Sequence, residues 1–287
     1  MLTVSIELQK AFGNTKFFIA LTFGCLLALI SAVGNIAVYQ NTLDQIIEWW
    51  DVVALDLSAS SCFRFFMTSD YIQPTTDLFY ALIPLLAAMP YGWSLCEEKN
   101  KGYLQNVYIR SERKKYLSAK AFAAALSGFV VITIPLVLNL LLCACFIPAY
   151  PTDISSVFTT GIYDSLMLVE LYYSAPIAYV CFLIVVTGVF GAVWALLVLV
   201  IGGYAHDSVR LIAGLFVLLY MFGALDYKLG VFIAGSGTEF TTLSPLIWLR
   251  GVVITGQTSL MVASVWVCAL LIISLLFALH FRKEDVL

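Results

Sequence analysis

Charged side chains are scarce in this chain of 287 residues. Asp, Glu, Lys and Arg together make up 11% of it, whereas 62% is hydrophobic and the mean hydropathy is +0.96. An ordinary soluble domain carries about a quarter charged residues and is apolar in roughly half of its positions. The composition therefore excludes a soluble domain and predicts an integral membrane protein.

Side chains that hold metals or form disulfides are few or badly placed. The two histidines, His206 and His280, lie at the ends of different apolar runs, so the sequence does not support a zinc or di-metal centre. Five of the seven cysteines lie inside apolar runs: Cys25, Cys143, Cys145, Cys181 and Cys268. Cys96 lies at the edge of a run, and Cys62 lies in a polar region. This distribution is not a disulfide framework.

The pair Cys143 and Cys145 could be interpreted as a metal site. Residues two apart on a helix point in different directions, however, and small buried hydrophobic side chains are the favoured interpretation. The chain also lacks the GxxxxGK[ST] pattern that cradles ATP phosphates. We assign no catalytic residue, metal ligand or cofactor to this chain.

Long apolar runs follow one another along the chain, and most are near the length of about 20 residues that a bilayer requires. The first lacks the small-residue cleavage pattern of a signal peptide, so it is expected to be a retained span. We predict an all-α membrane protein, residues 1–287 forming one domain with six spans, at about 17–38, 78–93, 119–146, 176–204, 211–225 and 260–281. The second and fifth are short.

The basic residues indicate the orientation. If the N-terminus is inside, twelve Lys and Arg lie in inner segments: Lys10, Lys16, Lys99, Lys101, Arg110, Arg113, Lys114, Lys115, Lys120, Arg210, Arg282 and Lys283. Only Arg64, Lys228 and Arg250 lie outside. Cytoplasmic loops are enriched in Lys and Arg, so both termini are expected to be cytoplasmic.

Three segments outside the spans also have recognisable patterns. Residues 1–16 alternate apolar and polar positions before Gly13 and Asn14, which predicts a short amphipathic helix on the bilayer. In the outer segment 39–77, Leu43 to Leu57 carries an apolar stripe that predicts an interfacial helix. Leu243 to Ile254 is apolar but too short to span, and we expect it to dip into the bilayer.

No charged residue lies in the middle of the predicted spans, where the main polar groups are Asn35 and Asn139. Because ion-coupled transporters usually need buried carboxylates or histidines, a proton-coupled transporter is disfavoured. Small residues such as Gly128 and Gly188 would let helices approach closely. That pattern fits packing within one chain and a dimer interface equally well.

The segment Ser94 to Lys120 is the one long charged stretch, with seven of the fifteen Lys and Arg. It links the second and third predicted spans. Tyr103, Leu104, Val107 and Tyr108 fall at helical spacing after Gly102, which predicts one to two turns of amphipathic helix. A basic inner loop needed only for topology would carry a similar charge.

The order of several residues resembles the inner loop of type-2 ATP-binding-cassette (ABC) exporter permeases. The residues that carry this resemblance are Glu98, Gly102, Arg110, Ser111, Tyr116, Leu117 and Lys120. Glu7 and Lys10 are similar to the N-terminal elbow of that family, and Leu243-Ser244-Pro245 to its outer re-entrant segment. The first outer segment is longer than in the shortest family members, which leaves the substrate class open.

The resemblance implies a coupling helix within residues 94–118 that sits in a groove of a separate ATPase subunit, which would bind ATP and Mg²⁺. The residues it assigns to ATPase binding are Glu97, Glu98, Gly102, Tyr103, Leu104, Val107, Tyr108 and Arg110. It also implies two ATPase copies, a second permease chain, identical or related, and a location in the bacterial plasma membrane among lipids, with no nucleic-acid partner. Expected cargoes are peptides, antimicrobials or lipids.

A different class of function stays open on the residues alone. A six-span membrane sensor, scaffold or enzyme without transport would have the same composition. An enzyme would need polar catalytic groups that converge at one membrane face, whereas the sequence offers scattered Asp and Tyr and two distant His.

Overall fold

The computed structural model describes residues 2–49, 60–70, 72–110, 112–152, 162–163, 165–234, 240–250 and 256–283. This part of the chain is helical and contains no β-strand. Five of its helices are long and apolar enough to cross a membrane: α2 (Thr15–Trp49), α7 (Arg113–Phe146), α10 (Pro176–Gly202), α11 (Ser208–Ala234) and α13 (Leu260–Lys283). The prediction of a multi-span all-α membrane protein is confirmed at this level.

The second predicted span is divided in the structure. Helix α4 (Pro74–Ala88) is apolar but only 15 residues long, a turn follows, and α5 (Ser94–Asn100) continues towards α6 (Tyr103–Arg110). At 1.5 Å per residue, α4 alone covers about 22 Å, less than the roughly 30 Å of a hydrocarbon core. The turn interrupts what the sequence suggests is one continuous run at 78–93.

Two helices are longer than the sequence suggests. Helix α2 continues past Val38 to Trp49, so the first part of the predicted interfacial helix is an extension of the span. The rest of that expected helix, residues 50–57, lies outside the described residues. Helix α11 runs from Ser208 to Ala234, because Asp226, Tyr227 and Lys228 continue the helix beyond the apolar run 211–225.

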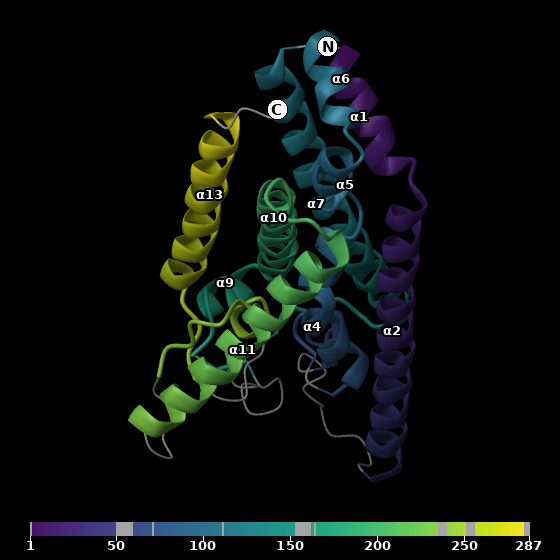
Figure 1. Cartoon of the computed structure of the whole chain (residues 1–287). Coiled ribbons are helices and arrows are strands. Elements are labelled where there is room, and N and C mark those ends of the chain that lie inside the picture. Colours follow the sequence, from purple (N-terminus) through teal and green to yellow (C-terminus); the bar gives the residue numbers. More distant parts are fainter. Residues whose placement is uncertain are drawn as a thin grey trace.

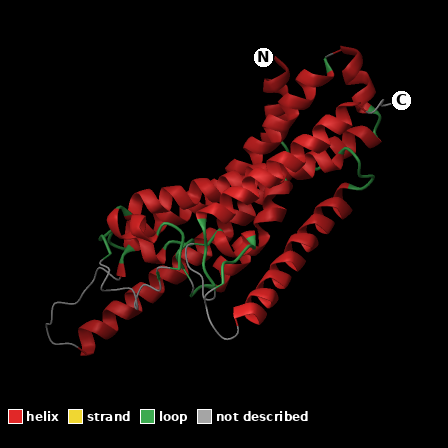
Figure 2. Ribbon diagram, turned by 90° about the vertical axis from the view of Figure 1, so that its left-hand side faces the viewer, coloured by secondary structure: helices red, strands yellow, loops and turns green. Residues whose placement is uncertain are grey.

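Helix α10 lies at the centre of the bundle. About two thirds of its central stretch (67%) is buried, compared with 6% for α11, which stands apart from the bundle in Figure 2. Helix α10 packs closely against α7, because a Cβ on Gly128 of α7 would lie 2.7 Å from the Cβ of Ala195 of α10. The predicted small residues Gly128 and Gly188 thus serve packing within the chain, since a Cβ on Gly188 would collide with Phe129 and Thr133 of α7.

One end of the molecule holds α1 together with parts of two other helices. Helix α1 (Leu2–Phe12), α6 and the C-terminal end of α13 lie together at the top of Figure 1. Asn14 separates α1 from α2: its amide donates to the carbonyl of Ala11, and its Oδ1 accepts from the backbone N–H of Phe17 at 2.7 Å. One side chain therefore caps the end of α1 and the start of α2.

The remaining described helices are short. They are α3 (Cys62–Phe65), α9 (Val169–Ser174) and α12 (Pro245–Trp248). Trp248 of α12 is fully buried and meets Phe190 near the middle of α10 edge to face. The segment expected to dip into the bilayer thus packs against the bundle over its described residues, and residues 251–255 lie outside them.

Candidate functional site at the α1–α5–α6 end

A lysine without solvent contact anchors this site. The Lys120 side chain on α7 is 0% exposed, and its ammonium lies 2.7 Å from Glu98 Oε2 of α5 and 3.5 Å from Glu7 Oε2 of α1. Glu7 is itself only 1% exposed. Three helices that are distant in the sequence are thus joined by one buried ammonium group.

Two tyrosines and a second lysine complete the cluster. Tyr91 donates its hydroxyl hydrogen to Glu7 at 2.6 Å, and Tyr116 donates to Glu98. Lys10 lies 2.8 Å from Glu7 Oε1 and 3.9 Å from Glu98 Oε1. The two carboxylates, Glu7 and Glu98, balance the two lysines, so the group has no net charge. We call it the α1–α5–α7 ion cluster, and its members are Glu7, Lys10, Tyr91, Glu98, Tyr116 and Lys120.

The pKa values of the cluster on α1 follow from this pairing. Burial raises the pKa of Glu7, but Lys120, Lys10 and the Tyr91 hydroxyl more than offset it and hold the pKa below its ordinary value of 4.5. Burial lowers the pKa of Lys10, but Glu7 and Glu98 outweigh it and raise the pKa above 10.5. Both groups are charged at neutral pH.

Glycine makes the turn from α5 to α6. Gly102 has a φ of +67°, a backbone conformation that side chains with a Cβ disfavour. Helix α6 then folds back over the end of the bundle (Figure 1). Leu104 is 1% exposed and packs among Ala11, Leu95 and Tyr116. The sequence prediction of a short amphipathic helix after Gly102 is confirmed.

The other residues that the sequence suggested for this segment divide between two environments. Val107 and Tyr108 are half-buried, and Tyr108 meets Tyr116 edge to face. Tyr103 is exposed beneath Lys10, whose ammonium lies 5.3 Å from the ring centroid. Arg110 ends α6, and its side chain lies outside the described part.

Glu97 belongs to a separate ion group. Its two oxygens each hold one ammonium, Lys16 at 3.2 Å and Lys101 at 3.1 Å. Burial raises the pKa of Glu97, but the hydrogen bonds and charges of Lys101 and Lys16 lower it overall. Lys16 also lies 3.3 Å above the ring of Trp93, a cation–π contact.

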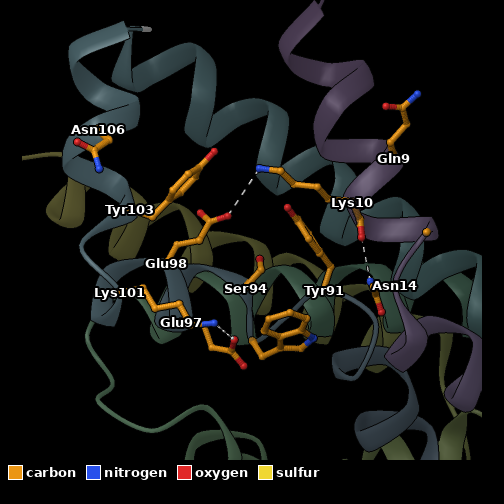
Figure 3. Close-up of a pocket in the computed structure, with 12 residues that line it drawn as sticks. Gln9, Lys10, Asn14, Tyr91, Ser94, Glu97, Glu98, Lys101, Tyr103 and Asn106 are labelled. Carbon is orange, nitrogen blue, oxygen red and sulfur yellow. Dashed lines mark hydrogen bonds and ion pairs between the residues drawn. The ribbon is translucent and has the colours of Figure 1, made fainter.

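A cavity of about 740 Å³ opens between α1, α5 and α6. Figure 3 shows Lys10 reaching in from α1 and Tyr103 from α6, with Glu98 between them. Tyr91, Trp93 and Lys101 also line it. The cavity presents charges of both signs beside aromatic rings, which suits binding of a polar group or contact with a partner. In the part of the chain that the structure describes, no group of three His, Cys, Asp or Glu side chains could hold a metal ion.

Sequence reasoning found several members of this site but not their arrangement. Glu7, Lys10, Glu98 and Lys120 were noted separately, and Lys120 was counted among the basic residues of the inner segments. The structure instead buries Lys120 against Glu7 and Glu98. Tyr91 was missed, and the one available signal was a tyrosine at the polar end of an apolar run.

Comparisons with known proteins add no assignment. No protein-family model matches the chain, and searches of curated proteins and of solved structures found no match. The function is therefore argued from the residues and their geometry.

Proposed function

We propose that this chain is the transmembrane subunit of a bacterial ATP-driven exporter, and that α5 and α6 receive the force of a separate ATPase. In this proposal α1 is an elbow helix on the inner surface of the plasma membrane, and both termini are cytoplasmic. The sixth crossing is formed by α4 and α5 together, since residues 74–100 continue in one direction through the turn at 89–93 (Figure 1).

One observation carries the proposal: α6 presents an outward surface while its base is fixed to the bundle by buried charges. Ile109 is 83% exposed, although α6 lies at an end of the molecule rich in charged residues. A single exposed apolar side chain is common on protein surfaces, so the proposal rests on the exposure of α6 as a whole. Gln105 and Asn106 are exposed on the same helix.

The α1–α5–α7 ion cluster connects this surface to other helices. Glu98 lies on α5, directly before the Gly102 turn, and it binds Lys120 on α7 and Lys10 on α1. A displacement of α6 would thus be passed to two further helices through ion pairs. Leu104, Val107 and Tyr108 pack inwards, so their role in ATPase binding is to hold α6, while Ile109 and its exposed neighbours make the contact.

The partners follow from the same proposal. Two ATPase subunits bind ATP and Mg²⁺, and a second permease chain, identical or related, completes the pathway. Peptides, antimicrobials and lipids are the proposed cargoes.

The test is recovery of an ATPase with the full chain. Affinity purification of the tagged chain from native membranes in mild detergent, followed by mass spectrometry, should recover a P-loop ATPase. Ile109→Glu should reduce its yield at least tenfold, because a charge would enter the contact surface. Ile6→Glu is the matched control, since Ile6 is also an exposed isoleucine at this end, on α1.

Two outcomes are decisive. If no P-loop ATPase is recovered under any condition, the exporter proposal fails. If the ATPase is recovered equally with the wild type, Ile109→Glu and Ile6→Glu, the exporter proposal stands but α6 is not the coupling helix. Gly102→Ala offers an independent check, because it strains the turn without touching the outward face.

A further inference from the structure

Two hollows meet at Trp93. One is the cavity of about 740 Å³ between α1, α5 and α6. The other is a slot of about 250 Å³ between α2, α4 and α11, and its apolar wall includes Leu85, Met89 and Ile212. Trp93 lines both, and Lys16 stands at the slot with its ammonium over the Trp93 ring. Trp93 is thus shared by a chamber that charged and aromatic side chains line and by an apolar slot.

The junction carries an excess of positive charge. Lys16 and Lys101 share the single carboxylate of Glu97. Each ammonium has three N–H donors, so both keep donors for another acceptor. The neighbouring acids, Glu7 and Glu98, are occupied by Lys10 and Lys120. An anion is therefore favoured here, whereas a free carboxylate for an additional ammonium group is lacking among these residues.

The position of the junction matches the boundary between membrane and water. Lys16 directly precedes Phe17, where the apolar run of α2 begins, and Trp93 provides an indole ring of the kind enriched at headgroup level. The slot is bounded by α11, whose membrane-length stretch is only 6% buried. Because Ser208, Val209 and Ile212 at the start of α11 line the slot, we place the slot at the edge of the hydrocarbon region and the chamber at the level of the lipid headgroups.

We propose that this junction binds one anionic phospholipid, with its phosphate beside Glu97, where it accepts from the remaining N–H groups of Lys16 and Lys101, and with one acyl chain in the slot. Basic pockets beside membrane helices on the inner side are suited to anionic headgroups. A chamber of this size falls within the range of about 300–1,000 Å³ of ligand sites. An acidic peptide fits less well, because its backbone would bring unpaired N–H and C=O groups into the apolar slot. This site does not depend on transport or on an ATPase.

Native mass spectrometry of the delipidated full chain in neutral detergent tests the site. Titration with phosphatidylglycerol should give a saturable one-to-one complex, and phosphatidylcholine should bind at least tenfold more weakly. Each basic residue near an anionic surface contributes about fivefold to binding. Lys16→Gln together with Lys101→Gln should therefore weaken phosphatidylglycerol binding about 25-fold.

Lys115→Gln is the matched control. The Lys115 side chain is as exposed as that of Lys101, 73% in both, and it also forms an ion pair with a nearby Glu, the N-cap residue Glu112. It does not line the cavity or the slot. Phosphatidylglycerol binding by this variant should equal that of the wild type. Lys101→Gln alone, at an exposed site, keeps the test valid if the double variant does not fold.

Further arms separate a lipid from other occupants. The soluble headgroup glycerophosphoglycerol should compete weakly with phosphatidylglycerol, because it lacks an acyl chain for the slot. Ala213→Trp narrows the slot, so it should weaken lipid binding without changing any charge. The proposal is overturned if the soluble headgroup competes as well as the lipid. It is also overturned if Lys115→Gln and the Lys16 and Lys101 variants lose binding equally, or if an acidic peptide displaces phosphatidylglycerol.

Discussion

Two buried polar regions at opposite ends of α7 use different chemistry. Around Lys120, the α1–α5–α7 ion cluster joins full charges from three helices. Asn139 lies about 28 Å further along α7, at 1.5 Å per residue. Its neutral amide donates to the Ala28 carbonyl at 2.8 Å and accepts from the Met67 N–H at 2.9 Å. The first region connects helices through charges, whereas the second holds a loop by its backbone.

The neutral region has further members of the same kind. Asn35 donates to the Phe65 carbonyl, and Tyr80 donates to the Thr68 hydroxyl at 2.8 Å. Most of these bonds hold the segment around α3 against the spans. Because hydrogen bonds between neutral groups tolerate loss better than buried charges do, we expect the two ends to respond differently to substitution.

The largest effect is expected from Lys120→Met. It leaves Glu7 and Glu98 facing each other's charge without the central ammonium, and breaking a buried ion pair typically costs about 3–5 kcal/mol. Thermal unfolding in mild detergent measures this loss. Adding Glu98→Gln should recover part of the stability, since the unpaired carboxylate is removed. A Lys120→Met protein as stable as the wild type would contradict the role assigned to the cluster.

A smaller effect is expected from Asn139→Leu, which keeps the side-chain volume similar. The Met67 N–H loses its acceptor, and a buried unsatisfied group costs about 1–3 kcal/mol. Hydrogen exchange should show faster exchange at Met67, while exchange in α1 stays unchanged. A loss of stability larger than that of Lys120→Met would reverse the comparison between the two ends.

Extremes of pH should loosen α1 and spare the neutral region. The pKa of Glu7 is lowered, so its stabilising contribution is complete above about pH 4.5 and is lost as the pH falls through the lower folded-state value. The pKa of Lys10 is raised, so its contribution is complete below about pH 10.5 and is lost as the pH rises through the higher folded-state value. Hydrogen exchange of α1, corrected for intrinsic rates, should show a plateau between these limits. Lys10→Gln should reduce the alkaline change, which Lys120 shares through its contact with Glu7, and should keep the acid change.

The smallest effect is expected at the surface pair of Lys115 and Glu112. Both side chains are exposed, at 73% and 67%, and such pairs on one helix contribute about 0.2–0.5 kcal/mol. Lys115→Gln should shift thermal unfolding only slightly, and added salt should abolish the difference. A loss comparable to that of Lys120→Met would mean that burial does not distinguish the two lysines.

The parts of the fold that were predicted from sequence are those set by local composition. Helix α10 begins at Pro176, as expected, because proline is favoured in the first turn of a helix and here opens an apolar run. The break at Asn14 and the helix after Gly102 were also visible, since both depend on residues within a few positions.

The parts that were not predicted depend on contacts between distant segments. The length of α11 could not be read from hydropathy, because Asp226 is stabilised there by donating backbone groups of Leu243 and Ser244. Lys120 looks like any basic residue at the start of a span until Glu7 and Glu98 are brought next to it. Burial of a charge is a tertiary property, and the sequence shows only that Lys120 is one of several basic residues near the start of a span.

Asn14 also bonds outside its own turn, because its amide lies 2.9 Å from the carbonyl of Pro90, between α4 and α5. The same side chain caps α1 and α2. One side chain therefore joins the end of α1, the start of α2 and the turn before α5. A displacement of α1 would reach α5 through this side chain as well as through the ion pairs of Glu98.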